Sequence, residues 1–321
     1  MAGDPNSPSP ALELLLCGTW STAERDTWAG ALRAAMPGHR LHLELPTGTP
    51  IDIAIVANPP AGALHGLPRL RLIQSLWAGV DRLLADPTLP LQVPIARMVD
   101  PAMNAAMAET ALWAALSLQR GTFRYAHQQR AACWHLLPQR RADEWTVLVL
   151  GLGQMGRTAA RALVRQGYRV RGWSRQPASA EDGVMLFHGD AALPRACADA
   201  DVLINLLPLT AETRGLLDAR RLGWLPRGAA VVNLARGAHV VDEDLLRALD
   251  AGAIGHAVLD VFHTEPLPPD HPYWHHPGVT VLPHAAAQTD PRSAAAVVAA
   301  NVAAVQDGRA PSHLVDRARG Y

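Results

Sequence analysis

The stretch TVLVLGLGQMGRTAARALVRQGYRVRGWSR, residues 146–175, decides the fold of the chain. It reads as an apolar strand, a glycine-rich turn, an amphipathic helix and a second strand. Gly151, Gly153 and Gly156 form the pattern G-x-G-x-x-G directly after the first strand and at the start of the helix. A dinucleotide-binding turn requires this context, so the stretch predicts a nucleotide site.

The chemistry of this turn follows from its glycines and from the helix that begins there. A tight turn favours residues without a Cβ atom, and a pyrophosphate must come close to backbone N–H groups. The start of the helix, at Gln154 and Met155, offers unpaired donors and a partial positive charge. The alternative is a Gly-rich turn that only packs a βαβ unit.

The end of the second strand indicates which nucleotide is bound. A carboxylate at this point usually holds a cofactor that lacks a 2′-phosphate. Here the strand closes with Ser174 and Arg175, and no acidic residue follows before Glu181. Ser174 can donate a hydrogen bond to a 2′-phosphate, and Arg175 can pair with it through two N–H groups. We therefore expect NADP(H) in preference to NAD(H). The alternative is a solvated Arg175 with loose specificity, which leaves NAD(H) possible.

Length and charge exclude several classes of protein. The chain has 321 residues, a formal net charge of +0 and a pI of about 7.3. Its length suggests two domains, and its charge favours neither a nucleic acid nor a membrane as partner. No apolar run reaches the ~20 residues that cross a bilayer. Residues 1–10, MAGDPNSPSP, are polar and Pro-rich without a basic segment, so we expect a disordered leader and not a signal peptide.

The cysteines indicate the cellular compartment, and the lack of lysine excludes some catalytic mechanisms. Cys17, Cys133 and Cys197 are widely spaced and form no C-x-x-C pair, so we expect buried, reduced thiols in a cytoplasmic protein. The sequence contains no lysine, which excludes a P-loop lysine and any Schiff-base mechanism.

Short apolar runs alternate with helical stretches in the first part of the chain. Residues 11–17 and 51–57 read as buried parallel strands. A helix near residues 21–35 separates them, with Ser21 as its N-cap. Residues 69–81 read as another strand followed by a small-residue turn. This alternation indicates an open α/β sheet.

The second part of the chain continues the alternation after a long helix. We expect that helix at about residues 103–119, as a hinge or connecting helix, and an irregular arm at 127–145. Further strands are expected at residues 200–208, 228–235, 253–262 and 278–283.

The Ala-rich tail, residues 293–308, is expected to form a helix that packs back on the first domain. The predicted fold class is α/β with two doubly wound domains. We expect a Rossmann NADP-binding domain at residues 99–285, inserted in a discontinuous substrate domain of residues 1–98 and 286–321.

Three charged or titratable residues follow the later strands. In open α/β sheets, ligands lie beyond the carboxyl ends of the strands. Arg236 follows VVNLA, Glu265 comes shortly after LDVF, and His284 follows VTVLP. All three side chains are therefore expected at the edge of the sheet where a ligand binds.

Together these residues form a set that can reduce a 2-oxo acid. Arg236 can hold the substrate carboxylate and polarise the ketone. Protonated His284 can give a proton to the alkoxide that develops as hydride arrives. Glu265 beside the imidazole favours its charged form. The competing interpretations are that Arg236 is solvated in a turn, that Glu265 is a loop carboxylate before Pro266, and that His284 caps a strand.

Two further features near the strand ends have alternatives as well. Asp260 can accept a hydrogen bond from a nicotinamide carboxamide, or it is an ordinary turn carboxylate. His271, His275 and His276 suggest a metal ion, but their Pro-rich loop offers no i, i+4 pairing and no Cys partner. We therefore expect exposed loop histidines and predict no metal site.

Several motifs resemble those of the D-isomer-specific 2-hydroxyacid dehydrogenases. GLGQMG, NLARG, LDVF-x-x-EPLP and LPH-AAA-QT match the motifs of that family in order and at suitable spacing. The longer segments VLINLLPLTAET, NLARGAHVVDEDLLRALDAG and VFHTEPLPPDHPYWHHP resemble its glyoxylate/hydroxypyruvate reductase branch, as do WSR and the QQ…W…LP arm. The likeness covers about residues 69–321, whereas the first 60 residues match weakly.

The resemblance implies a flavodoxin-like substrate domain and a set of catalytic and substrate-binding positions. The implied catalytic residues are Arg236, Glu265 and His284. Trp77, Ala78 and Gly79 match the turn whose backbone amides meet the substrate carboxylate, which Arg236 also binds. Trp77 replaces a glycine that is usual in the family; its bulky ring either narrows the pocket or points away and packs.

The resemblance also implies which further residues contact the cofactor and in which oligomeric state the chain assembles. The implied cofactor-binding residues beyond the glycine turn are Leu207, Pro208, Thr213, Ala235 and, as the nicotinamide contact, Asp260. The family is dimeric, with the connecting helix and the arm at the subunit interface, so a homodimer is expected.

We therefore expect an NADPH-dependent oxidoreductase that reduces glyoxylate to glycolate and hydroxypyruvate to D-glycerate. One alternative is a nucleotide-sensing, corepressor-like binding protein on the same scaffold. A sensor need not keep a proton donor, so the catalytic trio argues against it. Another alternative, a methyltransferase with the same glycine turn, predicts a ribose-binding acid where Ser174 and Arg175 stand.

Overall fold

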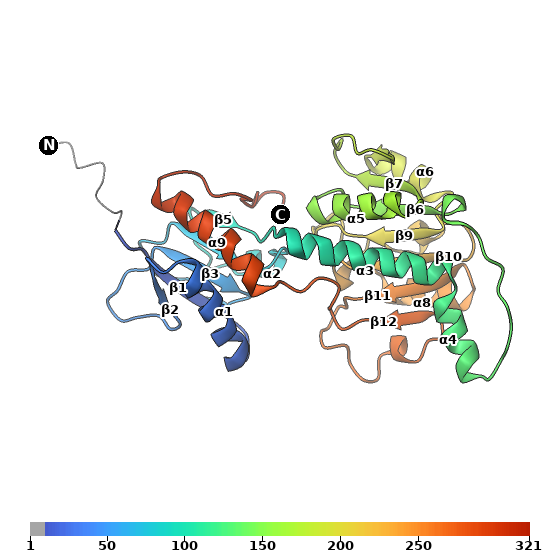
Figure 1. The fold of residues 1–321 in the computed structure, drawn as a ribbon, viewed down its shortest axis with the longest axis horizontal. Helices are drawn as coiled ribbons and strands as arrows, with labels where there is room; N and C mark the ends of the chain where they lie inside the picture. Colours follow the sequence, from blue (N-terminus) through green and yellow to red (C-terminus); the bar gives the residue numbers. More distant parts are fainter. Residues whose placement is uncertain (1–9) are drawn as a thin grey trace. The chain divides into compact units, whose positions relative to one another are not determined.

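The structure, a computed structural model, describes residues 10–321 and divides the chain into two compact units (Figure 1). Unit 1 is Met1–Ala102 together with Thr289–Tyr321, and unit 2 is Met103–Gln288. Apart from Pro10, the leader expected at residues 1–10 lies outside the described residues. Each unit has its own parallel sheet and its own core, so each is described by itself.

Unit 1 contains a five-stranded parallel sheet of order β2-β1-β3-β4-β5. Its strands are β1 (Glu13–Gly18), β2 (Arg40–His42), β3 (Ile53–Ala57), β4 (Leu72–Ser75) and β5 (Ile95–Ala96). This order is that of flavodoxin, in which the chain winds from the first strand in both directions. The prediction of a flavodoxin-like α/β fold is confirmed.

The helices of unit 1 are α1 (Thr22–Ala35), α2 (Asp81–Leu84) and α9 (Pro291–Gln306). Ser21 caps α1 as predicted, and Glu24 completes a capping box with it. The tail helix α9 packs against α1. Its Asn301 side chain donates a 2.7 Å hydrogen bond to Gln74 on β4, and both groups are buried.

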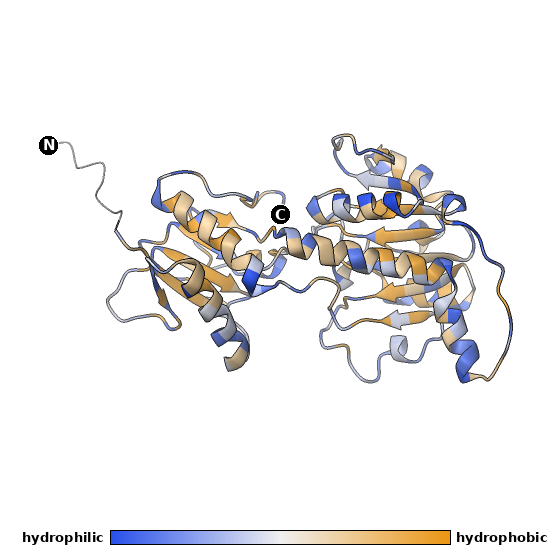
Figure 2. Ribbon diagram, in the orientation of Figure 1, coloured by the Kyte–Doolittle hydropathy of each residue, from blue (hydrophilic) through white to orange (hydrophobic). Residues whose placement is uncertain are grey.

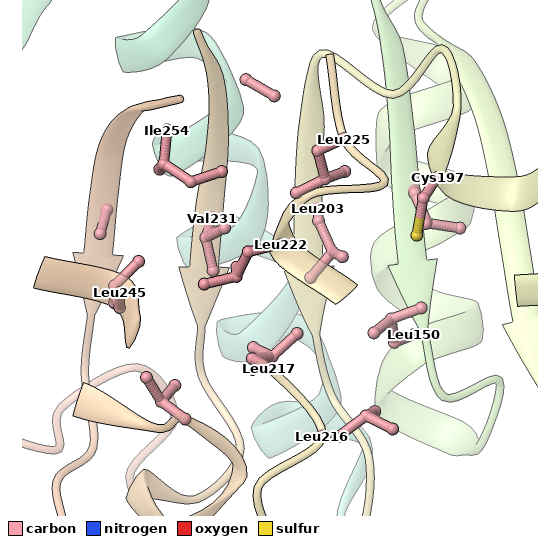
Figure 3. Close-up of a cluster of buried hydrophobic side chains, with 14 of the residues drawn as sticks. Leu150, Cys197, Leu203, Leu216, Leu217, Leu222, Leu225, Val231, Leu245 and Ile254 are labelled. Carbon is pink, nitrogen blue, oxygen red and sulfur yellow. The ribbon is translucent and has the colours of Figure 1, made fainter. Parts of the chain in front are cut away.

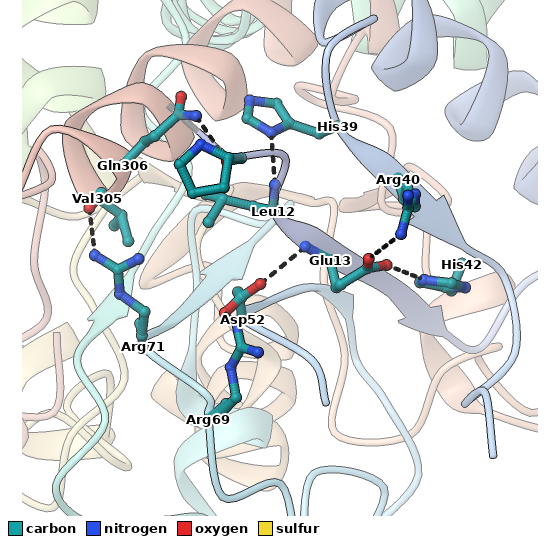
Figure 4. A network of polar contacts seen from close by, with 11 residues as sticks. Leu12, Glu13, His39, Arg40, His42, Asp52, Arg69, Arg71, Val305 and Gln306 are labelled. Carbon is teal, nitrogen blue, oxygen red and sulfur yellow. Dashed lines mark hydrogen bonds and ion pairs between the residues drawn. The ribbon is translucent and has the colours of Figure 1, made fainter. Parts of the chain in front are cut away.

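A polar network secures the edge of this sheet, because charged side chains there pair with one another and with the backbone (Figure 4). Glu13 on β1 accepts hydrogen bonds from Arg40 at 2.8 Å and pairs with His42 at 2.6 Å, both on β2. Asp52 accepts from the Glu13 backbone N–H and from Arg69. These contacts are structural, since each carboxylate joins neighbouring strands.

Unit 2 contains a seven-stranded parallel sheet of order β12-β11-β10-β9-β6-β7-β8. Its strands are β6 (Thr146–Leu150), β7 (Arg169–Ser174), β8 (Val184–His188), β9 (Val202–Asn205), β10 (Ala229–Asn233), β11 (Ile254–Leu259) and β12 (Val279–Val281). The strand order reverses direction between β6 and β9, as in a Rossmann fold, so the predicted doubly wound sheet is confirmed. The crevice outside that reversal is where such sheets bind ligands.

The helices of unit 2 cover both faces of its sheet. They are α3 (Pro101–Gln119, which starts two residues before the unit), α4 (Thr122–Arg130), α5 (Gln154–Arg165), α6 (Leu193–Cys197), α7 (Ala219–Leu222) and α8 (Asp242–Asp250). The connecting helix is α3, as expected. The irregular arm was predicted to start at residue 127, but α4 continues to Arg130 and the chain is irregular only from there to residue 141.

Alternate residues of the buried strands point into two hydrophobic clusters, one on each face. On β6, Leu148 and Leu150 belong to a cluster with α6, α7 and α8, whereas Val147 and Val149 pack with α3 and α5. Figure 3 shows side chains of the first cluster, and Figure 2 shows mostly apolar residues in the central strands of both sheets. Among residues 10–321, no helix combines the length and apolar character needed to cross a membrane.

The three cysteines differ in exposure. Cys197 is buried in the core of unit 2 and Cys17 is half-buried at the end of β1, but Cys133 in the arm is exposed. The expectation of buried thiols is therefore wrong for Cys133, because the arm does not fold into the core. All three are free thiols.

Candidate active site

The glycine turn after β6 has the backbone that only glycine supports. Gly151 adopts a φ of +93°, and its N–H donates to Trp173 at the end of β7. A Cβ on Gly156 would lie 1.7 Å from the carbonyl oxygen of Gly151, so α5 can approach the turn only with glycine at this position. Both positions therefore serve the close packing of helix and strand.

The third glycine of the motif faces open space. Gly153 is the N-cap of α5, and a Cβ built on it meets no atom within 4 Å. In the described part of the chain, the backbone N–H groups of Gln154 and Met155 have no hydrogen-bond acceptor. The N-terminal end of this 12-residue helix therefore carries a partial positive charge and two N–H donors, next to a space that no side chain fills. Such a site fits the pyrophosphate of a dinucleotide.

The end of β7 carries the two residues predicted to choose the nucleotide. Ser174 is the last residue of β7, and its hydroxyl donates to the carbonyl of Gln176 at 2.7 Å. Arg175 is partly exposed and pairs with Glu212 at 3.1 Å. The guanidinium is thus present at the strand end, but a carboxylate from another loop already contacts it.

A histidine and a carboxylate meet at the end of β12. His284 Nδ1 lies 2.8 Å from Glu265 Oε2, and the other oxygen of Glu265 accepts from the N–H of Phe262 at 3.0 Å. The imidazole is half-exposed, whereas the carboxylate side chain is only 22% exposed. The pair therefore holds Nδ1 against Glu265, and Nε2 has no hydrogen-bond partner among residues 10–321, so it can face a ligand.

Asp260 fixes the backbone that carries this histidine. Its two carboxylate oxygens accept from the N–H groups of Ala285 at 2.7 Å and Ala286 at 3.1 Å, and its carbonyl accepts from the N–H of His284. His284 sits there with a φ of +54°. Burial raises the pKa of the Asp260 carboxyl, and the two backbone hydrogen bonds oppose that shift. The observed contacts of Asp260 position the His284 turn; a nicotinamide contact stays a prediction.

Arg236 lies three residues beyond β10, where the chain enters a short 3-10 turn, Gly237–His239. Its guanidinium donates to the carbonyl of Ala235 at 2.7 Å, and it is partly exposed. Gly237 lies against the backbone of Phe262, with which any Cβ would collide at 2.0 Å. The Arg236 loop and the loop that leads to Glu265 are therefore packed together.

Two buried asparagines that were not among the predicted site residues support these loops. Asn205 ends β9 and donates to Asn233 at the end of β10 at 3.0 Å. Each side-chain oxygen also accepts a backbone N–H two residues ahead, from Leu207 and Ala235 respectively, at 3.3 Å. The repeated pair Asn-Leu at two strand ends is the signal that could have indicated this role.

Of the remaining predicted cofactor residues, Leu207, Pro208 and Thr213 lie in the loop after β9, and Ala235 lies two residues after β10. The Thr213 hydroxyl donates to Pro208 O at 2.8 Å and accepts from the N–H of Thr210, so it shapes the loop internally. Leu207 and Ala235 are buried at the strand ends beside it. These residues thus follow the ends of two neighbouring strands of unit 2, and their contact with a cofactor stays a prediction.

The predicted carboxylate-binding turn belongs to unit 1 and follows β4. Among the described residues, the N–H groups of Ala78 and Gly79 have no acceptor, which fits binding of a carboxylate. The N–H of Trp77, in contrast, donates to Ser75 Oγ at 3.0 Å. The Trp77 ring packs edge-on against Trp28 with the ring centres 6.3 Å apart, so it is anchored in unit 1.

Two of the three histidines of the Pro-rich loop, His271 and His276, stabilise turns of that loop. His271 and His276 each accept a backbone N–H two residues ahead, from Tyr273 and Gly278. His276 also faces Asp250, and His275 is exposed. The prediction of exposed residues is wrong for His271 and His276, which are partly buried because they cap turns.

Comparison with known proteins defines the class. Residues 112–286 match the family described as D-isomer specific 2-hydroxyacid dehydrogenase, NAD binding domain. The glyoxylate/hydroxypyruvate reductase A of Yersinia enterocolitica is 39% identical over 304 residues, which are 93% of this chain and 97% of that protein. The protein of the same name from Klebsiella pneumoniae is 40% identical over 307 residues, 94% of this chain and 97% of its own.

Solved structures agree with this assignment. A D-isomer specific 2-hydroxyacid dehydrogenase of Xanthobacter autotrophicus, in complex with NADPH and MES, has a TM-score of 0.91 and 40% identity over 97% of this chain and 100% of its own. An NADPH-dependent glyoxylate/hydroxypyruvate reductase of Sinorhizobium meliloti, with NADP and sulfate, has a TM-score of 0.90 and 32% identity over the same shares. The fold and the strand-end site are those of a nucleotide-dependent oxidoreductase. This chain belongs to the D-isomer-specific 2-hydroxyacid dehydrogenase family.

Proposed function

We propose that this protein reduces small 2-oxo acids with NADPH, converting glyoxylate to glycolate and hydroxypyruvate to D-glycerate. The observation that carries the proposal is the 2.8 Å pair of His284 and Glu265 in the same unit as the glycine turn. Relatives named glyoxylate/hydroxypyruvate reductase, similar over almost their whole length, support the substrate class.

In the proposed mechanism, each residue has one task at the reacting group. NADPH, when bound, supplies the hydride. Arg236 and the free amides of Ala78 and Gly79 bind the substrate carboxylate and orient the ketone. His284 gives its Nε2 proton to the ketone oxygen as that oxygen becomes an alkoxide, and Glu265 keeps the imidazole oriented through Nδ1.

The choice of NADPH rests on the end of β7. Arg175 offers a guanidinium to a 2′-phosphate, and the Ser174 hydroxyl can turn from Gln176 to donate to it. Relatives solved with NADPH or NADP support this choice. NADH, which lacks the phosphate, is expected as a weaker alternative.

The direct test follows NADPH absorbance after addition of glyoxylate or hydroxypyruvate. His284→Ala should lower kcat at least ~100-fold, the usual share of a general acid. The exposed His275 of the same unit is a matched control, and His275→Ala should keep the wild-type rate. Wild-type kcat in His284→Ala would refute the assigned proton donor.

The same assay separates an enzyme from a nucleotide sensor. A corepressor-like protein would bind NADPH tightly and turn over neither substrate. The His284–Glu265 pair favours the enzyme, because a sensor has no use for an oriented proton donor. Tight binding without turnover in the wild-type protein would instead support the sensor.

We infer that the chain acts as a homodimer in the cytoplasm. The arm after α4 exposes Trp134 fully, at 102%, and Leu136 at 81%, and surface of this kind favours a protein interface. The exposed thiol of Cys133 fits a reducing compartment. In sedimentation experiments, Trp134→Ser with Leu136→Ser should shift a dimer toward the monomer, and a monomeric wild-type protein would refute the dimer.

A further inference from the structure

An ion pair occupies the position predicted to read the cofactor. Arg175 Nη1 lies 3.1 Å from Glu212 Oε2, and the hydroxyl of Thr210 donates to the same oxygen at 2.7 Å. The two partners come from different elements, since Arg175 follows β7 and Glu212 lies in the loop after β9. The carboxylate therefore reaches the guanidinium from the neighbouring loop.

The loop that carries Glu212 is held in shape by its own hydrogen bonds. Thr213 donates to Pro208 O, and the N–H groups of Thr213 and Arg214 donate to Thr210 O. Thr213 is buried, whereas the Glu212 side chain is 64% exposed. Glu212 is thus presented from a fixed turn, and replacing its side chain should leave the turn intact.

The carboxylate keeps its charge at neutral pH. The hydrogen bond from Thr210 lowers the pKa of Glu212, with further lowering from a backbone hydrogen bond and from Arg175. A 2′-phosphate carries about −1.5 to −2 charges at pH 7. The phosphate and Glu212 would therefore meet as like charges beside one guanidinium.

We propose that Glu212 is a specificity-determining residue that competes with the 2′-phosphate for Arg175 and so moderates the preference for NADPH over NADH. The inference rests on the proposed function, because it needs Arg175 to bind that phosphate. A carboxylate at the strand end itself would repel the phosphate outright. From the neighbouring loop, Glu212 can be displaced, so NADPH still binds while NADH suffers no competition.

The test measures binding of two cofactor fragments, 2′,5′-ADP and 5′-AMP, by calorimetry. Glu212→Gln should bind 2′,5′-ADP about two- to fivefold tighter than wild type, the range for an exposed charge pair, with 5′-AMP unchanged. The gain should shrink in 1 M salt, where charges are screened beyond ~3 Å. In turnover with glyoxylate, the KM for NADPH should fall while kcat stays the same.

A matched control separates this contact from a general change in charge. Asp199→Asn also removes an exposed carboxylate that pairs with an arginine of β7. That arginine is Arg171, which is not predicted to contact the cofactor. It should bind both fragments as wild type does. An equal gain in Asp199→Asn, or unchanged or weaker binding of 2′,5′-ADP in Glu212→Gln, would overturn the role of Glu212.

The experiment also distinguishes failure of this inference from failure of the proposed function. If wild type prefers 2′,5′-ADP to 5′-AMP, and Arg175→Ala loses that preference while Glu212→Gln changes nothing, only the role of Glu212 is wrong. If wild type binds both fragments equally, the 2′-phosphate site itself is wrong, and the role of Glu212 with it.

Discussion

At the scale of single residues, two glycines of the motif have different expected tasks. Gly153 is expected to serve cofactor binding, and Gly156 is expected to serve folding stability. Gly153 has a φ of −72°, which alanine adopts without strain, and open space around its Cβ position. Because alanine is less favourable than glycine at an N-cap, Gly153→Ala should lose no more than about 1 kcal/mol of folding free energy. Its new methyl group enters the cradle expected to hold the pyrophosphate, so the Kd for NADPH should rise at least about tenfold, or about 1.4 kcal/mol. Calorimetry and thermal unfolding of one preparation measure both effects, and unchanged NADPH affinity would place the pyrophosphate elsewhere.

Gly156 should show the opposite behaviour. A Cβ there would lie 1.7 Å from Gly151 O, which is backbone and cannot turn aside, so α5 must move away from β6. We expect Gly156→Ala to lose on the order of 3 kcal/mol of folding free energy in urea unfolding, the upper range for overpacking. A Gly156→Ala protein as stable as wild type would mean that the turn can relax around a methyl group.

Much of the site could be predicted residue by residue, but not how its members hold one another. Arg236, Glu265 and His284 were predicted from their place after strands, and the structure places Glu265 against His284. Asp260 holds the His284 turn because its oxygens accept from particular backbone N–H groups. The spacing of residues in the sequence does not show which N–H groups these are. The Arg175 ion pair was missed because its partner comes from another loop.

At the scale of elements, the sequence predicted all of the fully buried strands of unit 2 and missed one exposed edge strand and two very short strands. The apolar runs of β6, β9 and β10 are buried on both faces, so they stand out. The edge strand β8 was missed because all of its residues are partly exposed or exposed. The short strands β2 and β5, of 3 and 2 residues, carry too few side chains for a period.

The contact of β11 with α4 makes a pH-dependent prediction for stability. His256 on β11 stacks on Phe123 of α4 at 4.6 Å and pairs with Thr280 of β12 at 2.9 Å. Burial, with a smaller effect of His276, lowers its pKa from 6.5 to about 4. Below pH 6.5 the unfolded chain therefore binds a proton that the folded chain does not, and stability falls until the folded state titrates near pH 4.

The size of this effect can be measured by urea unfolding at two pH values. Between pH 7 and pH 5, protonation of His256 in the unfolded state should lower the free energy of unfolding of the wild-type protein by about 1 to 2 kcal/mol. His256→Gln keeps a hydrogen-bonding group for Thr280 but does not titrate, so its stability should depend less on pH by that amount. The exposed His65 of unit 1 gives the control His65→Gln, which should follow wild type. Equal pH dependence of His256→Gln and wild type would contradict the buried neutral imidazole.

At the scale of the whole molecule, the two units divide the proposed tasks. The two clusters on the faces of the seven-stranded sheet draw all their residues from Met103–Gln288, and a separate cluster fills unit 1. The glycine turn, Arg175, Arg236 and the His284–Glu265 pair belong to unit 2. The free amides of Ala78 and Gly79 belong to unit 1.

This division predicts that residues 103–288, expressed alone, bind the cofactor without catalysis. The fragment is continuous in sequence and keeps its sheet and both of its clusters, so it should fold as a domain does. NADPH at 100 times its Kd should stabilise it by about 2.7 kcal/mol, as it should the intact chain. Reduction of glyoxylate should be lost, because the fragment lacks the amides proposed to hold the substrate carboxylate. A folded fragment that reduces glyoxylate at the intact rate would show that unit 1 contributes nothing to substrate binding, whereas a folded fragment without NADPH affinity would mean that unit 1 completes the cofactor site.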